Sequence, residues 1–346
     1  MIKFVAIAFF VSFFVNLLII ILAKKYGAFL SDYFHIGPQT FHTHPTPRVG
    51  GLAVFSGITL ALLLANFPLL VLFSLPVFLA GLLEDLSGKL SPKIRIIFLI
   101  ISALLVFKFL EVKIIRVDLP FFDPLLKIEI ISLLFTAFAI VGIVNAINII
   151  DGFNGLASMV SIMIFMAIAF VAYKLGDYEI TSICVIASFS LLGFFLLNYP
   201  FGLVFLGDGG AYFTGFLIGI CSILLVKKHP QVSAWFVFMV NLYPIYETLF
   251  SIYRKCILRK RSAMSPDGLH LHMIIYKIFI KRFLNLYAPD VRNPLTSVFL
   301  WIINAFAIVP ALLFWDNTKI LIVCCIFFCI FYTYLYWKIL KLRLRE

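Results

Sequence analysis

The chain has 346 residues, of which 63% are hydrophobic and 13% are charged, and its formal net charge is +12. Soluble domains are about 45–50% apolar and about 25% charged, so the composition excludes an ordinary soluble protein and indicates a protein embedded in a bilayer. Lys and Arg accumulate in the cytoplasmic loops of membrane proteins. The positive charge is therefore interpreted as a topology signal, and we expect no nucleic-acid partner.

Hydrophobic stretches follow one another along the whole chain. Helices of roughly 17–25 apolar residues can cross a bilayer, because a helix satisfies its own backbone hydrogen bonds. The sequence therefore predicts an all-α, polytopic membrane protein with a single integral membrane domain, 1–346. The eleven predicted spans are 2–23, 49–66, 69–86, 94–110, 128–147, 155–173, 180–198, 209–226, 234–253, 295–314 and 319–338.

The positive charges also predict an orientation. Lys24 and Lys25 follow the first span, and only Lys3 stands at its beginning. With the N-terminus outside, most of the other Lys and Arg fall on the inner side, so we expect a cytoplasmic C-terminus. A basic inner surface attracts anionic headgroups, which makes membrane lipids expected partners.

The first predicted inner loop ends with Arg48 and the glycine pair 50–51, which allows close approach of the backbone to another backbone or to a ligand. Arg48 is a candidate substrate-binding residue, and the alternative is a plain turn with a topology-setting charge. His42 and His44 precede it, but no neighbouring Cys or acidic residue completes a zinc site.

Two adjacent carboxylates, Glu84 and Asp85, end the third predicted span. A carboxylate within a membrane segment costs roughly 2.5–3.5 kcal/mol, and adjacent carboxylates repel each other unless a cation or a proton intervenes. The pair therefore indicates a bound cation, or a proton on one of the two carboxylates. The alternative is a solvated helix end with Lys89 and Arg95 as counter-ions.

Amides and one acid recur every three positions in Asn145, Asn148, Asp151 and Asn154, at the inner end of the fifth predicted span. On a helix they form a drifting stripe along one side, which glycines at 152 and 155 then interrupt. Such a stripe suits a uracil, a ribose or a sugar amide. The alternative is a set of hydrogen bonds between helices, a common role of Asn in membrane bundles.

Asp208 lies between glycines where the eighth predicted span begins. Helix N-terminal N–H groups favour phosphate, and the carboxylate can hold a metal ion beside it. An ordinary N-cap is the alternative.

The inner segment 254–294 contains His270 and His272, which share a face only if the backbone there is extended. Residues 273–288 are basic and apolar, which predicts an amphipathic helix lying on the membrane. An ordinary polar loop is the alternative.

Five motifs together resemble the polyprenyl-phosphate N-acetylhexosamine-1-phosphate transferase superfamily. These motifs are PTPRVGG at 45–51, GLLEDL with LSPKIR at 81–95, NAINIIDGFNGL at 145–156, LGDGGAYFTG at 206–215 and SPDGLHLH at 265–272. They occur in the family's order and on one predicted membrane face. Eleven spans with an outside N-terminus resemble the branch that transfers N-acetylglucosamine-1-phosphate, rather than the ten-span peptidoglycan branch.

The resemblance implies that a UDP-N-acetylhexosamine gives its sugar-1-phosphate to undecaprenyl phosphate and releases UMP, with Mg²⁺ or Mn²⁺ as cofactor. It implies a catalytic role for Glu84, Asp85 and Asp208, with Asp208 as the metal ligand. Phe205 matches a residue that stacks on uracil. The residues assigned to substrate binding are Arg48, Asn145, Asn148, Asp151, Asn154, Phe205, His270 and His272.

Three positions depart from the family pattern: Glu84 and Asn154 stand where Asp is common, and Met273 stands where many members have a further His. They point to a subgroup that makes a surface polysaccharide such as O-antigen, in the bacterial inner membrane with a cytoplasmic active site. The alternatives are peptidoglycan synthesis and a polytopic transporter, and a homodimer is left open. Asp85, Asp151 and Asp208 gathered in one inner site would favour an enzyme, whereas a path through the protein would favour a transporter.

Overall fold

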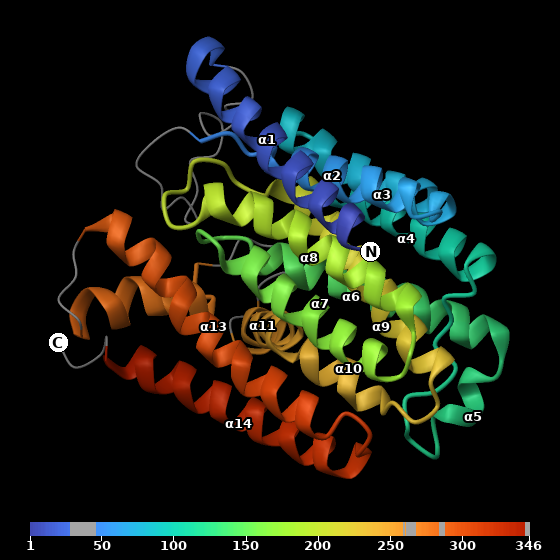
Figure 1. Ribbon diagram of the computed structural model, residues 1–346. Coiled ribbons are helices and arrows are strands. Elements are labelled where there is room, and N and C mark those ends of the chain that lie inside the picture. The colour runs from blue at the N-terminus through green and yellow to red at the C-terminus, as the bar shows by residue number, and fades with distance from the viewer. Residues whose placement is uncertain (28–45, 259, 261–267, 284–287, 343–346) are drawn as a thin grey trace.

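The computed structural model describes residues 1–27, 46–258, 260, 268–283 and 288–342, which form helices and loops without a β-strand. The helices lie side by side in an elongated bundle (Figure 1). His42 and His44 lie outside the described residues, as do parts of the predicted loop 254–294. The predicted all-α architecture is confirmed.

The helices follow one another in chain order and are joined mostly by short loops. They are α1 (Ile2–Tyr26), α2 (Gly50–Leu64), α3 (Pro68–Ser87), α4 (Pro92–Phe109), α5 (Asp123–Leu126), α6 (Glu129–Ile150), α7 (Leu156–Lys174), α8 (Tyr178–Asn198), α9 (Gly207–Lys228), α10 (Ala234–Val240), α11 (Leu242–Tyr253), η2 (Arg254–Leu258), α12 (Leu271–Ile274), η3 (Ile275–Phe283), α13 (Pro289–Leu313) and α14 (Thr318–Leu342). The two η elements are π-helical.

Each predicted span is helical, but not every one is a clear membrane crossing. Within the described part of the chain, eight helices are long and apolar enough to cross a bilayer, and the bent pair α10–α11 makes a ninth. The helix α2 has only 15 residues, fewer than the roughly 17 that a crossing needs. The helix α4 has 18 residues but carries Lys93, Arg95 and Lys108. Length and composition therefore support fewer spans than the eleven predicted.

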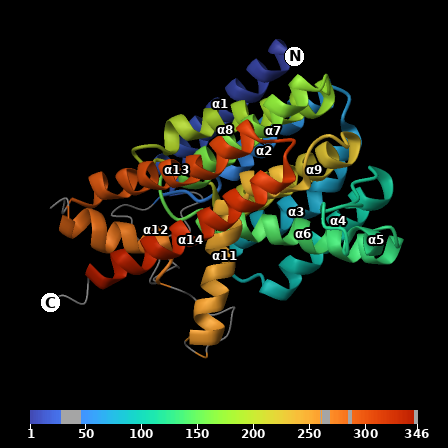
Figure 2. The ribbon, with the colours of Figure 1, turned by 90° about the horizontal axis from the view of Figure 1, so that it is seen from below.

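The predicted span 234–253 is not one continuous helix. The axes of α10 and α11 meet at 72° around Asn241. Pro244 lacks the N–H that would bond to the carbonyl of Val240, and its ring clashes with that carbonyl in a continuous helix. As a result α11 is seen end-on in Figure 1 and projects from the bundle in Figure 2.

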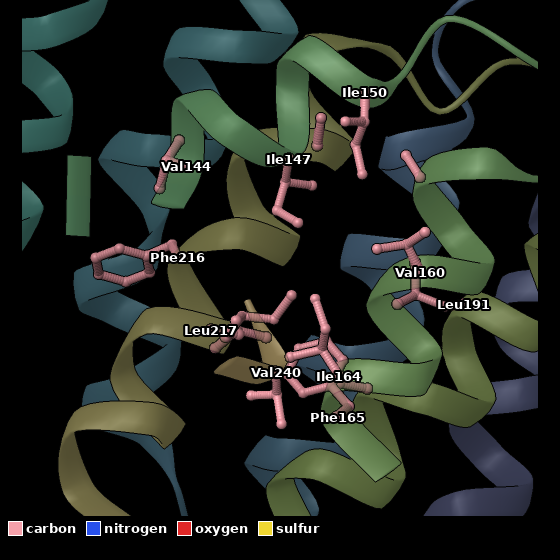
Figure 3. Packing of buried hydrophobic residues seen from close by; sticks show 14 of the residues in the cluster. Val144, Ile147, Ile150, Val160, Ile164, Phe165, Leu191, Phe216, Leu217 and Val240 are labelled. Atoms are coloured by element: carbon pink, nitrogen blue, oxygen red, sulfur yellow. The ribbon is translucent and has the colours of Figure 1, made fainter. Parts of the chain in front are cut away.

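The centre of the bundle is α9, whose most apolar stretch is 94% buried. The helices α2, α3, α6, α7 and α8 pack around it. Figure 3 shows part of this core, where Phe216 and Leu217 of α9 lie near Ile147 of α6 and Ile164 of α7. The N-terminal residues of α9 are thereby held in one place by several helices.

The predicted amphipathic helix at 273–288 has a different environment from the one expected. Residues 271–283 are helical as α12 and η3, but Ile275, Tyr276, Ile278 and Ile280 are buried. The neighbouring elements are α13 and α14. The apolar side of this segment is therefore covered by the protein itself and not by lipid.

Candidate active site

A carboxylate from another helix holds the start of α9. Asp85, in the last turn of α3 and only 7% exposed, accepts hydrogen bonds from the backbone N–H of Asp208 at 2.8 Å and of Gly209 at 2.9 Å. The first N–H groups of a helix lack partners within the helix and carry partial positive charge. Asp85 satisfies two of them, so at the start of α9 these two N–H groups bind a carboxylate of the protein itself.

Asp208 is paired with an arginine of α4. Its Oδ2 accepts a hydrogen bond from Nη1 of Arg95 at 2.7 Å, and the two side chains are only 15% and 19% exposed. Glu84 and Tyr212 also interact electrostatically with Arg95. The guanidinium that the sequence indicates only as a counter-ion of the 84–85 pair is thus bonded to Asp208.

The segment before α2 pairs with the segment before α9. The N–H of Phe205 donates to the carbonyl of Pro47, and the N–H of Gly50 donates to the carbonyl of Phe205, both at 2.9 Å. This pairing places Arg48 and Phe205, two predicted substrate-binding residues, next to the start of α9. Both side chains are partly buried.

The positive charge of Arg48 acts on Asp85, Asp151 and Asp208 together. Partial burial raises the pKa of Asp151 to about 7, although Arg48 and the N–H of Gly207 favour its charged form. The structure therefore brings the three predicted aspartates to one place, where the positive charge of Arg48 favours the charged form of each.

Two glycines allow α3 and α9 to meet this closely. A Cβ atom on Gly81 would lie 2.4 Å from the backbone nitrogen of Gly209. Gly207 has φ +75°, a left-handed conformation that favours glycine, and a Cβ there would lie 2.1 Å from the carbonyl oxygen of Arg48. Larger residues at either position would separate Asp85 from the start of α9.

The predicted stripe of amides lies partly in α6, with Asn145 and Asn148, and partly in the loop after it, with Asn154. Asn145 donates to a carbonyl one turn earlier in α6, and Asn148 lies partly buried in the last turn, before Asp151 ends the helix. Asn154 is 6% exposed and donates through Nδ2 to the carbonyl of Pro200 at 2.8 Å. Its side chain therefore joins the loop after α6 to the loop after α8.

A buried glutamate holds the histidine motif. Glu247 of α11 is fully buried, and its Oε1 lies 2.9 Å from Nδ1 of His270 and 3.1 Å from the N–H of Leu271. The hydroxyl of Tyr332, from α14, donates to Oε2 at 2.5 Å. Two helices distant in the sequence, α11 and α14, therefore fix the position of His270.

His272 contacts the loop after α6, which follows Asp151. The rings of His270 and His272 stack with centroids 5.1 Å apart, and His272 also contacts the ring of Phe153 edge-on at 5.5 Å. A Cβ on Gly152 would lie 3.6 Å from Nε2 of His272. The two predicted histidines are thus adjacent to the loop after α6.

Glu84 does not duplicate the role of Asp85. Its Oε2 accepts a hydrogen bond at 2.8 Å from the N–H of Leu90 in the turn before α4, while its charge acts on Arg95 and Asp208. The described residues contain no group of three or more His, Cys, Asp or Glu that could hold a metal ion by itself.

Sequence reasoning missed the contributions of Arg95 and Glu247. Arg95 belongs to a basic helix start, which is common at membrane surfaces, so its partner could not be inferred. Glu247 did carry a signal, because an acid inside an apolar span is costly and marks a functional hypothesis by default.

Three aspartates of this site, Asp85, Asp151 and Asp208, fall within residues 67–226, which match the model of glycosyl transferase family 4. The chain is 30% identical over 270 residues to the undecaprenyl-phosphate alpha-N-acetylglucosaminyl 1-phosphate transferase of Thermotoga maritima, covering 76% of this chain and 78% of that protein.

Two further similarities differ greatly in extent. The chain is 26% identical over 275 residues to a probable undecaprenyl-phosphate N-acetylglucosaminyl 1-phosphate transferase of Bacillus subtilis, covering 78% of this chain and 76% of that protein. It is 32% identical to a phospho-N-acetylmuramoyl-pentapeptide-transferase of Staphylococcus carnosus, but over only 77 residues, or 22% of this chain and 24% of that protein.

Proposed function

This chain belongs to glycosyl transferase family 4 and is a glycosyl-1-phosphate transferase, and we propose that it transfers N-acetylhexosamine-1-phosphate from a UDP-sugar to undecaprenyl phosphate. UMP is released, and the lipid product begins a cell-surface polysaccharide such as O-antigen. The observation that carries this proposal is the cluster at the start of α9, where Asp85, Asp151 and Asp208 meet Arg48 and Arg95.

The arrangement of charge suits phosphoryl transfer. An oxygen of the lipid phosphate attacks the β-phosphorus of the UDP-sugar, so a new P–O–P bond forms and the bond from that phosphorus to the UMP oxygen breaks. Such a reaction depends on positioning and charge neutralisation more than on covalent participation of the protein. Arg48 and Arg95 are suited to bind phosphate oxygens through their planar guanidinium groups, and His270 and His272 lie beside the same site.

The acidic oxygens at this site suit a hard cation. Mg²⁺ is usually bound by one or two carboxylates, with substrate phosphates and water completing its octahedral coordination. Asp208 is the proposed ligand of Mg²⁺ or Mn²⁺, with substrate phosphate and water supplying the other oxygen ligands. When bound, the ion would neutralise charge on the phosphates. Asp85 and Arg95 hold Asp208 in place, through its backbone N–H and its carboxylate respectively.

The donor is proposed to carry N-acetylglucosamine or a related N-acetylhexosamine. The similarities that extend over three quarters of the chain are to proteins named for N-acetylglucosaminyl 1-phosphate transfer, whereas the similarity to a peptidoglycan enzyme covers 22% of the chain. Asn145, Asn148, Asp151 and Phe205 are proposed to bind the nucleotide.

The test is a transfer assay with the purified protein, undecaprenyl phosphate, Mg²⁺ and a panel of UDP-sugars that includes UDP-MurNAc-pentapeptide. We expect UMP and a lipid-linked sugar pyrophosphate with a UDP-N-acetylhexosamine only, and no product from the Asp208→Asn control. A product from UDP-MurNAc-pentapeptide alone, or complementation of a strain lacking the peptidoglycan enzyme, would refute the proposed donor.

The active site is proposed to face the cytoplasm, with the N-terminus outside and the C-terminus inside the bacterial inner membrane. Basic residues near the site end of the bundle support this orientation. Cys256 is exposed and follows α11, whereas Asn317 precedes α14 at the opposite end of the bundle. A membrane-impermeant thiol reagent should label an Asn317→Cys variant from outside and leave Cys256 unlabelled, and the opposite pattern would invert the topology.

A further inference from the structure

A cavity of about 870 Å³ opens between α11 and α14, away from the carboxylate cluster. Its volume lies within the roughly 300–1,000 Å³ that is typical of ligand sites. Tyr246 of α11 and Thr333 of α14 line the cavity, and their hydroxyl groups share a hydrogen bond of 2.7 Å. That bond joins α11 to α14 at the cavity, whose other lining residues belong to α14.

The side of α14 that lines the cavity changes from apolar through aromatic to basic residues along the helix. Ile330, Tyr334, Trp337, Lys338 and Lys341 line the cavity in that order, at spacings that place them on one face of a helix. Ile330 and Tyr334 are each 61% exposed and Trp337 is 39% exposed, so the protein leaves this face largely uncovered. The ammonium group of Lys338 lies 5.5 Å from the centre of the Tyr334 ring.

This order matches the cross-section of one bilayer leaflet. Aliphatic residues suit the depth of the acyl chains, Tyr and Trp favour the interface, and lysines near the surface attract anionic headgroups. The basic end of α14 is also the end next to the candidate active site, because the hydroxyl of Tyr336 donates to the carbonyl of Leu269, beside His270, at 3.1 Å. We propose that this groove binds one anionic phospholipid of that leaflet, with its phosphate held by Lys338 and Lys341.

The groove is separate from the site of transfer. The helix α14 packs against α10, α12, α13 and η3, whereas Asp85 and Asp208 belong to α3 and α9. A phosphate bound at Lys338 and Lys341 is therefore held by elements other than those that carry the carboxylates. The proposed occupant is a bilayer phospholipid and not the reacting acceptor, so the inference does not depend on the proposed function.

The inference can be tested by native mass spectrometry of the full-length protein released from neutral detergent. The protein is mixed with phosphatidylglycerol, with phosphatidylcholine or with undecaprenyl phosphate at equal concentrations. We expect the wild type to retain phosphatidylglycerol in preference to phosphatidylcholine, whereas the retention of undecaprenyl phosphate, which binds at the site of transfer, should not depend on the two lysines. In Lys338→Gln/Lys341→Gln the retention of phosphatidylglycerol should fall about fivefold for each lysine removed.

Two further variants separate a specific site from a general charge effect. Lys24→Gln/Lys25→Gln removes the same charge from the exposed end of α1 and should retain phosphatidylglycerol like the wild type. Ile330→Trp fills the groove without changing charge and should lose the bound lipid. Equal retention of phosphatidylglycerol and phosphatidylcholine by the wild type, equal losses in both double-lysine variants, or a matching loss of undecaprenyl phosphate in Lys338→Gln/Lys341→Gln would each overturn the inference.

Discussion

The carboxylate of Asp85 accepts a hydrogen bond from the backbone N–H of Asp208 at 2.8 Å, so one acidic residue of the candidate site positions the other. Its second oxygen is engaged by the N–H of Gly209 at 2.9 Å. Asp208 points its own carboxylate to Arg95. The direction of the Asp208 side chain therefore depends on a contact between α3 and α9 and on another between α9 and α4.

Replacing Asp85 with Asn should destabilise the protein as well as lower its activity. The amide retains one acceptor but turns an NH₂ group toward one of the two N–H donors, and loss of a helix cap costs about 0.5–2 kcal/mol. We expect a lower midpoint of thermal unfolding in detergent. Glu84→Gln is the matched control, because the hydrogen bond that Glu84 accepts from Leu90 lies in a turn and not at a helix start, so its loss should shift the midpoint less. An unchanged midpoint for Asp85→Asn would contradict the capping role.

Asp208→Asn should lose far more activity than Asp151→Asn, and added Mg²⁺ should restore it only partly. The amide removes the charge that holds a hard cation and also leaves Arg95 without its carboxylate partner. The fall in kcat should exceed the roughly 10–100-fold that loss of an outer-sphere partner of a metal site costs. Asp151→Asn should raise KM for the UDP-sugar more than it lowers kcat. Near-normal turnover of Asp208→Asn at limiting Mg²⁺ would show that the metal is bound elsewhere.

Glu247 should act on the reaction through His270. A double-mutant cycle tests this, because residues that act as one unit give losses that do not add. We expect His270→Ala to remove little further activity from Glu247→Gln in the transfer assay. Tyr332→Phe removes one of the donors to Glu247 but retains the carboxylate, and should have a smaller effect. Independent, additive losses from Glu247→Gln and His270→Ala would show that Glu247 only stabilises the fold.

Asp177, which begins α8 at the other end of the bundle, should make stability depend on pH. Burial raises its pKa, but hydrogen bonds from the N–H of Ile180 and from His229, with the charge of Lys228, bring it below its ordinary value. A depressed pKa stabilises the fold above the unfolded value of about 3.9. That stabilisation is lost as the pH falls through the lower folded pKa.

The unfolding midpoint of the wild type should therefore fall from about pH 5 to about pH 3 more steeply than that of Asp177→Asn. The amide variant is a suitable control, because its oxygen can still accept the capping hydrogen bond from Ile180 while the charge is removed. Parallel pH profiles for the two proteins would assign the acid sensitivity to other groups.

The sequence by itself determined the all-helical membrane class and the approximate place of each helix, because long apolar stretches in a bilayer have few alternatives to the helix. It also identified the polar motifs, since polar groups in such stretches are costly and therefore conspicuous. The break between α10 and α11 is encoded locally as well, in Pro244, although hydropathy alone predicts 234–253 as one span.

Only the tertiary structure decided how those motifs meet. The hydrogen-bonded residues are far apart in the sequence. Asp208 is 123 residues from Asp85 and 113 residues from Arg95. Tyr332 is 85 residues from Glu247. Hydropathy and helical periodicity describe which face of a helix is apolar, but they do not specify which neighbour that face contacts. The packing of α3 and α6 against α9, and of α4 against α3 and α6, decides it. As a result Asp85 caps α9 and Arg95 is the partner of Asp208.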